Sequence, residues 1–145
     1  MLNDILLTTF LTVFSGVTVY AISQVIIKFF IEPIHKQKEL IGEIADALIF
    51  YANVYSNPGT CSKQKNDEAS DRLRQLASYL ISKTHIIKWY KLFSWLKIVP
   101  KKEKILEAHK ELIGLSNSVY SGRPLENHER RKKIEKYLNI DTGMS

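Results

Sequence analysis

The chain has 145 residues, a formal net charge of +6 and a hydrophobic content of 45%. Its one cysteine, Cys61, excludes an intramolecular disulfide framework and fits a reducing compartment. About 110 residues follow an opening apolar run, which is enough for one small domain with its own core. The sequence contains no repeat, no low-complexity tract and no long linker, so we expect a single domain behind that run.

The first predicted element is an apolar helix. Residues 5–27 carry no charged side chain and include 13 Leu, Ile, Phe or Val residues. Each such residue favours membrane insertion by roughly 0.3–0.6 kcal/mol near the helix centre. As a helix the run spans roughly 34 Å, against about 30 Å for the hydrocarbon core of a bilayer. The sequence therefore predicts a transmembrane helix within residues 1–31.

A cleaved signal peptide and a buried core helix are the alternatives to this membrane anchor. Residues 1–4 contain no Lys or Arg, the run is too long for a signal core, and no small-x-small pattern ends it. Lys28, Lys36 and Lys38 follow the run, whereas Asp4 precedes it. The positive-inside rule then predicts an inner (cytoplasmic) membrane protein with its N-terminus outside and residues 32–145 in the cytoplasm.

Small and hydroxyl-bearing residues gather on one face of the predicted span. At about 100° per residue they fall within an arc of about 120°. They are Thr8, Thr9, Thr12, Ser15, Gly16, Val19 and Ser23. Lipid gives no reason to collect such residues, whereas close helix–helix approach and interhelical hydrogen bonds do. We expect a packing face in a homo-oligomer rather than a pore lining, because the span contains no ionisable residue.

Residues 34–55 form the next predicted helix. Its apolar arc includes Ile41, Ile44 and Leu48, and its opposite arc is acidic. Phe50 and Val54 interrupt the polar face, which indicates contact with two neighbouring elements. The preceding Glu32-Pro33 pair either starts a new helix or kinks a continuing span, because proline is tolerated in a first turn.

The remaining chain predicts further helices joined by short loops. Asn57-Pro58-Gly59 is typical of a turn, because proline fixes φ and glycine adopts positive φ freely. The other predicted elements are a polar loop at 60–66 and helices at 67–84, 101–115 and 126–138. Together they predict an all-α protein with a single N-terminal transmembrane helix and a cytoplasmic bundle of four to five helices.

Residues 86–99 differ from the predicted helices around them. Both tryptophans of the chain, Trp89 and Trp95, lie here with Lys88 and Lys91 between apolar residues. Because apolar residues occur nearly all round, the pattern favours a buried core element. The first alternative is an interfacial helix with its aromatic rings at headgroup depth, and the second is base stacking on a nucleic acid.

The positive charge is concentrated in the second half of the chain. Residues 32–82 contain 6 Lys or Arg and 7 Asp or Glu, whereas residues 83–136 contain 14 and 6. An anionic leaflet, a phosphate-bearing ligand or an acidic protein would be attracted by this excess, and a solvated helix face is the alternative. The candidate anionic-ligand residues are Asn117, Ser118, Arg123, Arg130, Arg131, Lys132 and Lys133.

The sequence predicts no enzyme, no cofactor and no metal site. The four histidines have no metal-ligand spacing, and Cys61 has no evident catalytic partner. No glycine-rich phosphate loop or nucleophile elbow occurs. Glu39, Glu43 and Asp46 share a helix face, but Lys36 beside them favours a solvated face over a cation site.

Several segments resemble small uncharacterised bacterial proteins that have one N-terminal span and a helical cytoplasmic part. The matching stretches are 31–34, 41–45, 47–57 and 112–119, and the resemblance covers most of the chain. It assigns no residue a role. In layout alone the chain is also similar to membrane effectors of phage defence, which pair a short membrane segment with a cytoplasmic module that senses a nucleotide messenger.

These observations predict a non-enzymatic, self-associating membrane protein. Its basic cytoplasmic domain is expected to bind an anionic partner, either a nucleotide-like ligand or an acidic surface. Residues 34–55 are expected to couple this event to the span, because only Pro33 separates them from it. The alternative function is a passive membrane anchor or scaffold for a partner protein.

Overall fold

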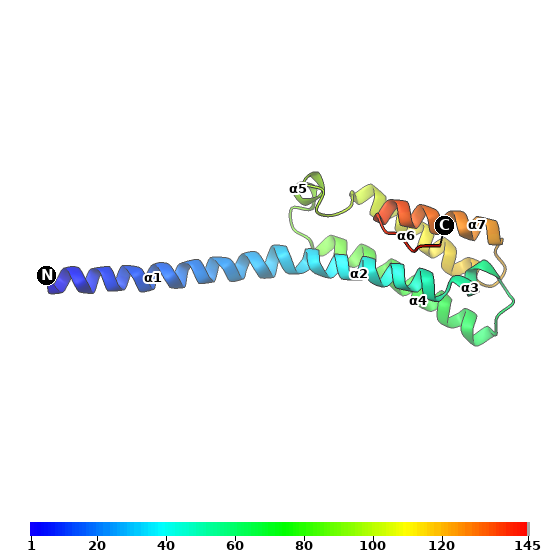
Figure 1. The fold of residues 1–145 in the computed structure, drawn as a ribbon, viewed down its shortest axis with the longest axis horizontal. Coiled ribbons are helices and arrows are strands. Elements are labelled where there is room, and N and C mark those ends of the chain that lie inside the picture. Colours follow the sequence, from blue (N-terminus) through cyan, green and yellow to red (C-terminus); the bar gives the residue numbers. More distant parts are fainter. Residues whose placement is uncertain (145) are drawn as a thin grey trace.

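The computed structural model describes residues 1–144, which form helices joined by short loops (Figure 1). The elements are α1 (Leu2–Ile26), the π-helical turn η1 (Ile27–Ile31), α2 (Glu32–Phe50), α3 (Ala52–Ser56), α4 (Lys63–Ile86), α5 (Tyr90–Trp95), α6 (Lys102–Ser118) and α7 (Pro124–Leu138). The predicted all-α fold is confirmed: one long apolar N-terminal helix precedes a set of packed helices.

Helix α1 projects from the rest of the molecule as a rod (Figure 1). None of its 25 residues is buried, and its large apolar side chains are mostly exposed. The helical stretch from Leu2 to Phe50 is long and apolar enough to cross a membrane. The alternative of a buried core helix is wrong, because nothing within residues 1–144 covers this apolar surface.

The first helix continues into α2 without a break at Pro33. In a regular α-helix the proline ring would collide with the carbonyl of Phe29, four residues earlier. The chain avoids this clash with the π-turn η1, in which the Glu32 N–H donates to the Ile27 carbonyl five residues back. The continuing-span alternative is therefore correct, and α1 and α2 form a single rod.

Helices α2, α4, α6 and α7 form an up-and-down bundle (Figure 1). Helix α4 packs against both α2 and α6, α7 packs against α6, and α3 contacts α7. The most buried apolar side chains of the core are less than 2% exposed. Among them are Ile44, Leu48, Leu73, Leu76, Leu80, Ile105, Leu112, Leu115 and Ile134. Ile44 and Leu48 lie on the apolar arc predicted for residues 34–55, and the other positions lie in the helices predicted from apolar periodicity.

Two differences between the predicted and observed boundaries have a local physical reason. The predicted polar loop at 60–66 is shorter, because the Ser62 hydroxyl accepts a hydrogen bond of 3.4 Å from the Lys65 N–H and starts α4 early. The predicted helix at 34–55 is interrupted at Tyr51, whose φ and ψ of −94° and 13° are not helical. Phe50 is 69% exposed, whereas Val54 is buried. The predicted contact of this segment with two neighbouring elements is confirmed, because α2 and α3 each contact both α4 and α7.

The expectation that residues 86–99 form a buried core element is wrong. Trp89 is 68% exposed and Trp95 is 77% exposed. The reason is that α5 is only six residues long and lies at the end of the bundle from which α1 emerges (Figure 1). Only Ile87 and Val99, at the two ends of the segment, are buried.

Candidate functional site

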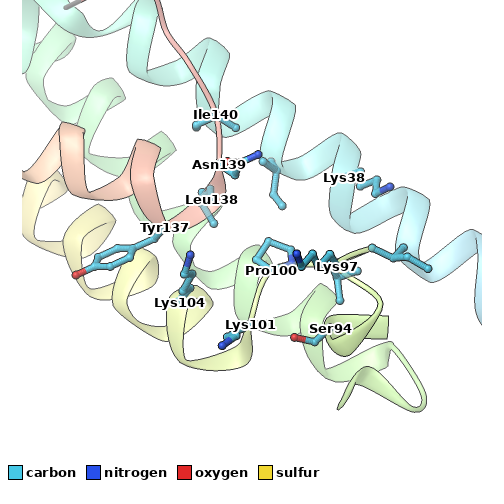
Figure 2. A pocket seen from close by; sticks show the side chains of 13 residues that line it. Lys38, Ser94, Lys97, Pro100, Lys101, Lys104, Tyr137, Leu138, Asn139 and Ile140 are labelled. Carbon is cyan, nitrogen blue, oxygen red and sulfur yellow. The ribbon is translucent and has the colours of Figure 1, made fainter. Parts of the chain in front are cut away.

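A lysine-lined cavity lies where α2, the loop between α5 and α6, the start of α6 and the end of α7 meet (Figure 2). Its volume is about 530 Å³. Four lysines line it: Lys38, Lys97, Lys101 and Lys104. Its apolar walls come from Ile41, Ile98, Val99, Pro100, Leu138 and Ile140. Within residues 1–144 no acidic side chain lines the cavity, so it combines positive charge with apolar surface.

The start of α6 strengthens the positive potential of this cavity. Lys101 is the N-cap residue of α6, and its side chain makes no capping hydrogen bond. The first N–H groups of the helix therefore lack a side-chain acceptor, and the N-terminal end of the helix dipole is positive. Lys104 follows in the first turn, together with Glu103, whose side chain does not line the cavity. Both the peptide groups and the two ammonium groups here favour an anion.

Lys97 reaches the cavity from an unusual backbone conformation. Its φ is +58°, in the left-handed region. The Ile98 N–H donates to the Phe93 carbonyl at 2.9 Å and the Lys97 N–H donates to the Ser94 carbonyl at 3.1 Å, which is a Schellman motif at the end of α5. Glycine is the usual residue at this position, because a side chain there costs roughly 1–2 kcal/mol. The chain nevertheless carries a lysine here.

The four cavity lysines have no acidic partner within residues 1–144. Some basic residues of the bundle do have one: Arg72 is 2.9 Å from Glu43, and Lys110 is 2.7 Å from Glu107. None of the ion pairs in the part of the chain that the structure describes involves a cavity lysine. The cavity therefore holds uncompensated positive charge, which an anionic ligand would neutralise.

Two arginines of the predicted anionic-ligand set, Arg130 and Arg131, form hydrogen bonds to other side chains of the protein. Arg131 is only 3% exposed, and its guanidinium donates to Glu135 at 3.1 Å and to Thr142 at 3.0 Å. Arg130 donates to Glu111 at 2.9 Å and to Glu126 at 2.7 Å. Hydrogen bonding to Glu126 raises the pKa of Arg130 above its ordinary value. Both side chains stabilise the packing of α7.

The other predicted anion-binding residues do not converge on one site. Asn117 accepts a hydrogen bond of 2.6 Å from Arg74 on α4, whereas the Ser118 hydroxyl bonds to Asn127 on α7 at 2.5 Å. Arg123 is the N-cap residue of α7. Lys132 and Lys133 are exposed, and Lys133 lies 3.5 Å from Glu111. The sequence thus located the basic half of the chain but not the residues that enclose a cavity.

The lysine-lined cavity was missed because its members are far apart in the sequence. Lys38 belongs to a segment whose charges nearly balance, Lys97 lies between two predicted helices, and Lys101 and Lys104 lie in the first turn of the helix predicted at 101–115. One sequence signal was available: residues 83–102 contain six lysines and no acidic residue. Only the packing of α2 against the later helices brings Lys38 beside that run.

The predicted packing face of α1 has its polar groups satisfied within the helix. Thr8, Thr9, Thr12, Ser15 and Ser23 each donate to a carbonyl three or four residues back, at 2.8–2.9 Å. Such bonds allow hydroxyl groups to face lipid or another helix. Nothing lies within 4 Å of a Cβ added at Gly16, so this face is open to a partner. Self-association through it stays a prediction.

Among residues 1–144, no group of three His, Cys, Asp or Glu side chains is placed to hold a metal ion. No protein-family model, curated protein or solved structure matches the chain. The resemblance to small bacterial single-span proteins therefore stays a prediction.

Proposed function

We propose that this chain is a non-enzymatic, self-associating membrane protein that binds a small anionic ligand and couples binding to its membrane span. The ligand is an anion with an apolar or planar part, which is the chemistry of a nucleotide. One observation carries this proposal: the lysine-lined cavity is built against the same unbroken helix that forms the apolar rod.

Coupling follows from the position of the cavity along that helix. Lys38 and Ile41 contact the cavity from α2, about two to three turns beyond Ile31. The opposite walls come from the α5–α6 loop and the end of α7. An anion that binds several lysines draws these elements toward α2. Because α2 and α1 are one rod, a displacement of α2 moves the span with it.

The proposed location is the inner membrane, with the helical domain in the cytoplasm. Lys28, Lys36, Lys83 and Lys88 line a groove at the end of the span, whereas Asp4 lies at the opposite end. This asymmetry supports the orientation given by the positive-inside rule. The open, small-residue face around Gly16 supports self-association of the span.

Native mass spectrometry of the detergent-extracted protein tests both halves of the proposal. We expect an oligomer that retains a small anion. The double variant Lys101→Glu and Lys104→Glu should lose that added mass and keep the subunit count. Lys132→Glu with Lys136→Glu is the matched control, since both lysines are exposed on α7 and lie outside the cavity.

A monomer in gentle detergent would contradict self-association. Retention of the same anion by the cavity variant would contradict the assigned site. If the extracted wild-type protein carries no anion, titration with inorganic pyrophosphate provides the second measurement, and equal binding by the cavity and control variants would then refute the site.

A further inference from the structure

Exposed aromatic and aliphatic side chains surround α5 beside the end of the apolar rod. Trp89, Leu92, Trp95 and Leu96 are all exposed. The ring centroid of Phe30, in η1, lies 5.1 Å from that of Trp89 and 6.3 Å from that of Phe93. The α5 segment, residues 86–98, therefore packs against η1, where α1 ends, rather than at the far end of the bundle.

The depth of this segment follows from the helix geometry. Asp4 and Phe30 are separated by 26 residues, which corresponds to about 39 Å of helix. A bilayer including its headgroup regions is about 40–45 Å thick. When Asp4 lies at the outer headgroups, Phe30 and the tryptophan that it contacts therefore lie at the level of the inner headgroups.

Hydrogen bonds hold one side of the α5 segment against the bundle, and its two tryptophans lie on the exposed side. The Tyr90 hydroxyl donates to the Pro100 carbonyl at 2.6 Å and accepts from the Gln37 amide at 3.4 Å. Burial raises the pKa of Tyr90. Trp89 precedes α5 in the left-handed region with φ of +55°, an uncommon conformation for an aromatic residue. Exposing two tryptophan side chains to water on a segment that is held in place is energetically unfavourable.

The charges beside the segment are complementary to an anionic membrane surface. Lys83 and Lys88 belong to the acid-free run at 83–102. They line the groove of about 390 Å³ at the end of the rod together with Lys28 and Lys36. The one acid in this groove, Glu32, is paired with Lys36 at 2.5 Å. The Lys88 ammonium also lies 4.8 Å from the ring centroid of Phe29.

We infer that the α5 segment docks on the anionic leaflet as a second membrane contact, with Trp89 and Trp95 at headgroup depth and the groove lysines on lipid phosphates. Tryptophan prefers this interfacial level, and basic side chains beside it bind anionic headgroups. The inference rests on the proposed membrane location of α1, but it is independent of the ligand cavity. It fixes the bundle against the membrane at two points.

Tryptophan fluorescence tests the inference directly, because both tryptophans of the chain lie in the α5 segment. The full chain is reconstituted in phosphatidylcholine vesicles with and without phosphatidylglycerol. We expect strong quenching by lipids brominated near the headgroup, weak quenching by aqueous acrylamide, and a larger effect in the anionic vesicles. Trp89→Phe and Trp95→Phe each leave one reporter and separate the two positions.

Charge reversal provides the matched comparison. Lys83→Glu with Lys88→Glu, which reverses two of the groove lysines, should abolish the dependence on phosphatidylglycerol. Lys63→Glu with Lys65→Glu should leave it unchanged. These exposed lysines belong to the first turn of α4, and α4 begins at the end of the bundle farthest from α1 (Figure 1). Equal quenching in all three proteins would overturn the role of the lysines.

Two further outcomes would overturn the docking itself. Tryptophans that are quenched by acrylamide but not by brominated lipid face water. Tryptophans shielded from both quenchers are covered by protein, such as a second copy. Phe14→Trp in a chain lacking Trp89 and Trp95 serves as the control for the span. Lipids brominated deep in their acyl chains should quench the reporter at position 14. If they do so while the α5 reporters stay unquenched by headgroup-brominated lipids, the docking is refuted and the proposed membrane location of α1 is retained.

Discussion

At the residue scale, Asn127 connects three elements of the bundle. Its side chain is fully buried, donates to the Tyr55 carbonyl at 2.7 Å and accepts from the Ser118 hydroxyl at 2.5 Å. Asn127→Ala removes the donor to the Tyr55 carbonyl, whereas the Ser118 hydroxyl keeps its bond to the Leu115 carbonyl at 2.9 Å. We therefore expect a loss of about 1–3 kcal/mol in the free energy of unfolding, mainly from the unpaired Tyr55 carbonyl. Urea unfolding of the detergent-solubilised chain, followed by near-ultraviolet circular dichroism, measures it.

Asn117→Ala is the control for this prediction. Asn117 is exposed, and within residues 1–144 its side chain bonds only to Arg74. Its removal should therefore change the free energy of unfolding by less than about 0.5 kcal/mol. Equal losses in the two variants would show that the buried amide of Asn127 has no special role.

Tyr55 gives the bundle a predictable alkaline sensitivity. Its hydroxyl donates to the Leu48 carbonyl at 2.6 Å, and burial raises its pKa from 10.0 to about 12. The folded state therefore favours the neutral phenol. This stabilisation is complete below pH 10 and is lost as the pH rises toward 12. One pKa unit corresponds to about 1.4 kcal/mol, so about 2–3 kcal/mol should disappear over this window.

Urea unfolding as a function of pH measures this loss against Tyr55→Phe. The variant should be less stable near neutral pH by about 1 kcal/mol, because one hydrogen bond is gone. Its stability should fall less steeply between pH 10 and 12. Tyr51 and Tyr90, whose pKa values are also raised by burial, remain in both proteins. Parallel pH curves would refute the contribution of Tyr55.

At the element scale, the π-turn before Pro33 sets the rotation of the span relative to the bundle. Pro33→Ala restores an N–H group that can bond to the Phe29 carbonyl, so the turn should close into a regular α-helix. A π-turn contains one residue more than an α-helical turn. Closing it into a regular α-helix therefore rotates α1 by roughly 100° about the shared axis. Any contact between the span and its partners would then be made by a different face.

Spin-label distances check this rotation. Labels at Tyr20→Cys on α1 and His85→Cys on α4, in a Cys61→Ser background, should give a shifted distance distribution in the Pro33→Ala variant. Glu32→Ala retains the proline and should leave the distribution unchanged. An unchanged distribution in Pro33→Ala would show that the π-turn does not depend on the proline.

At the scale of the whole molecule, the two proposed activities belong to different parts of the chain. Replacing residues 5–27 with an apolar helix that lacks Thr, Ser and Gly removes the packing face but leaves the lysine-lined cavity intact. We expect native mass spectrometry to show retained anion and a lower subunit count. An unchanged oligomer would place self-association in the bundle and favour the alternative function, a passive anchor or scaffold.

The local elements were predictable because they depend on short-range spacing. The charge-free run at 5–27, the apolar periodicity of the later helices and the turn at Asn57-Pro58-Gly59 each follow from neighbouring residues. The early start of α4 was missed, although Ser62 is a typical N-cap residue. The interruption at Tyr51 has no signal in the sequence that we can identify.

Burial and the assembly of sites were not predictable in the same way. Arg131 belongs to a run of four basic residues that suggested a solvent-facing anion site, yet the folded end of the chain covers it. Trp89 and Trp95 suggested a core, yet α5 lies outside it.

The sequence by itself determined that the chain is helical, that its opening segment is long and apolar enough to cross a membrane, and that its positive charge is concentrated late. Only the tertiary structure decided that the opening helix continues through Pro33 and that Lys38 lines the same cavity as Lys97, Lys101 and Lys104. The physical reason is that periodicity and charge-free length are properties of adjacent residues, whereas a cavity is enclosed by side chains that only the packing of distant helices brings together.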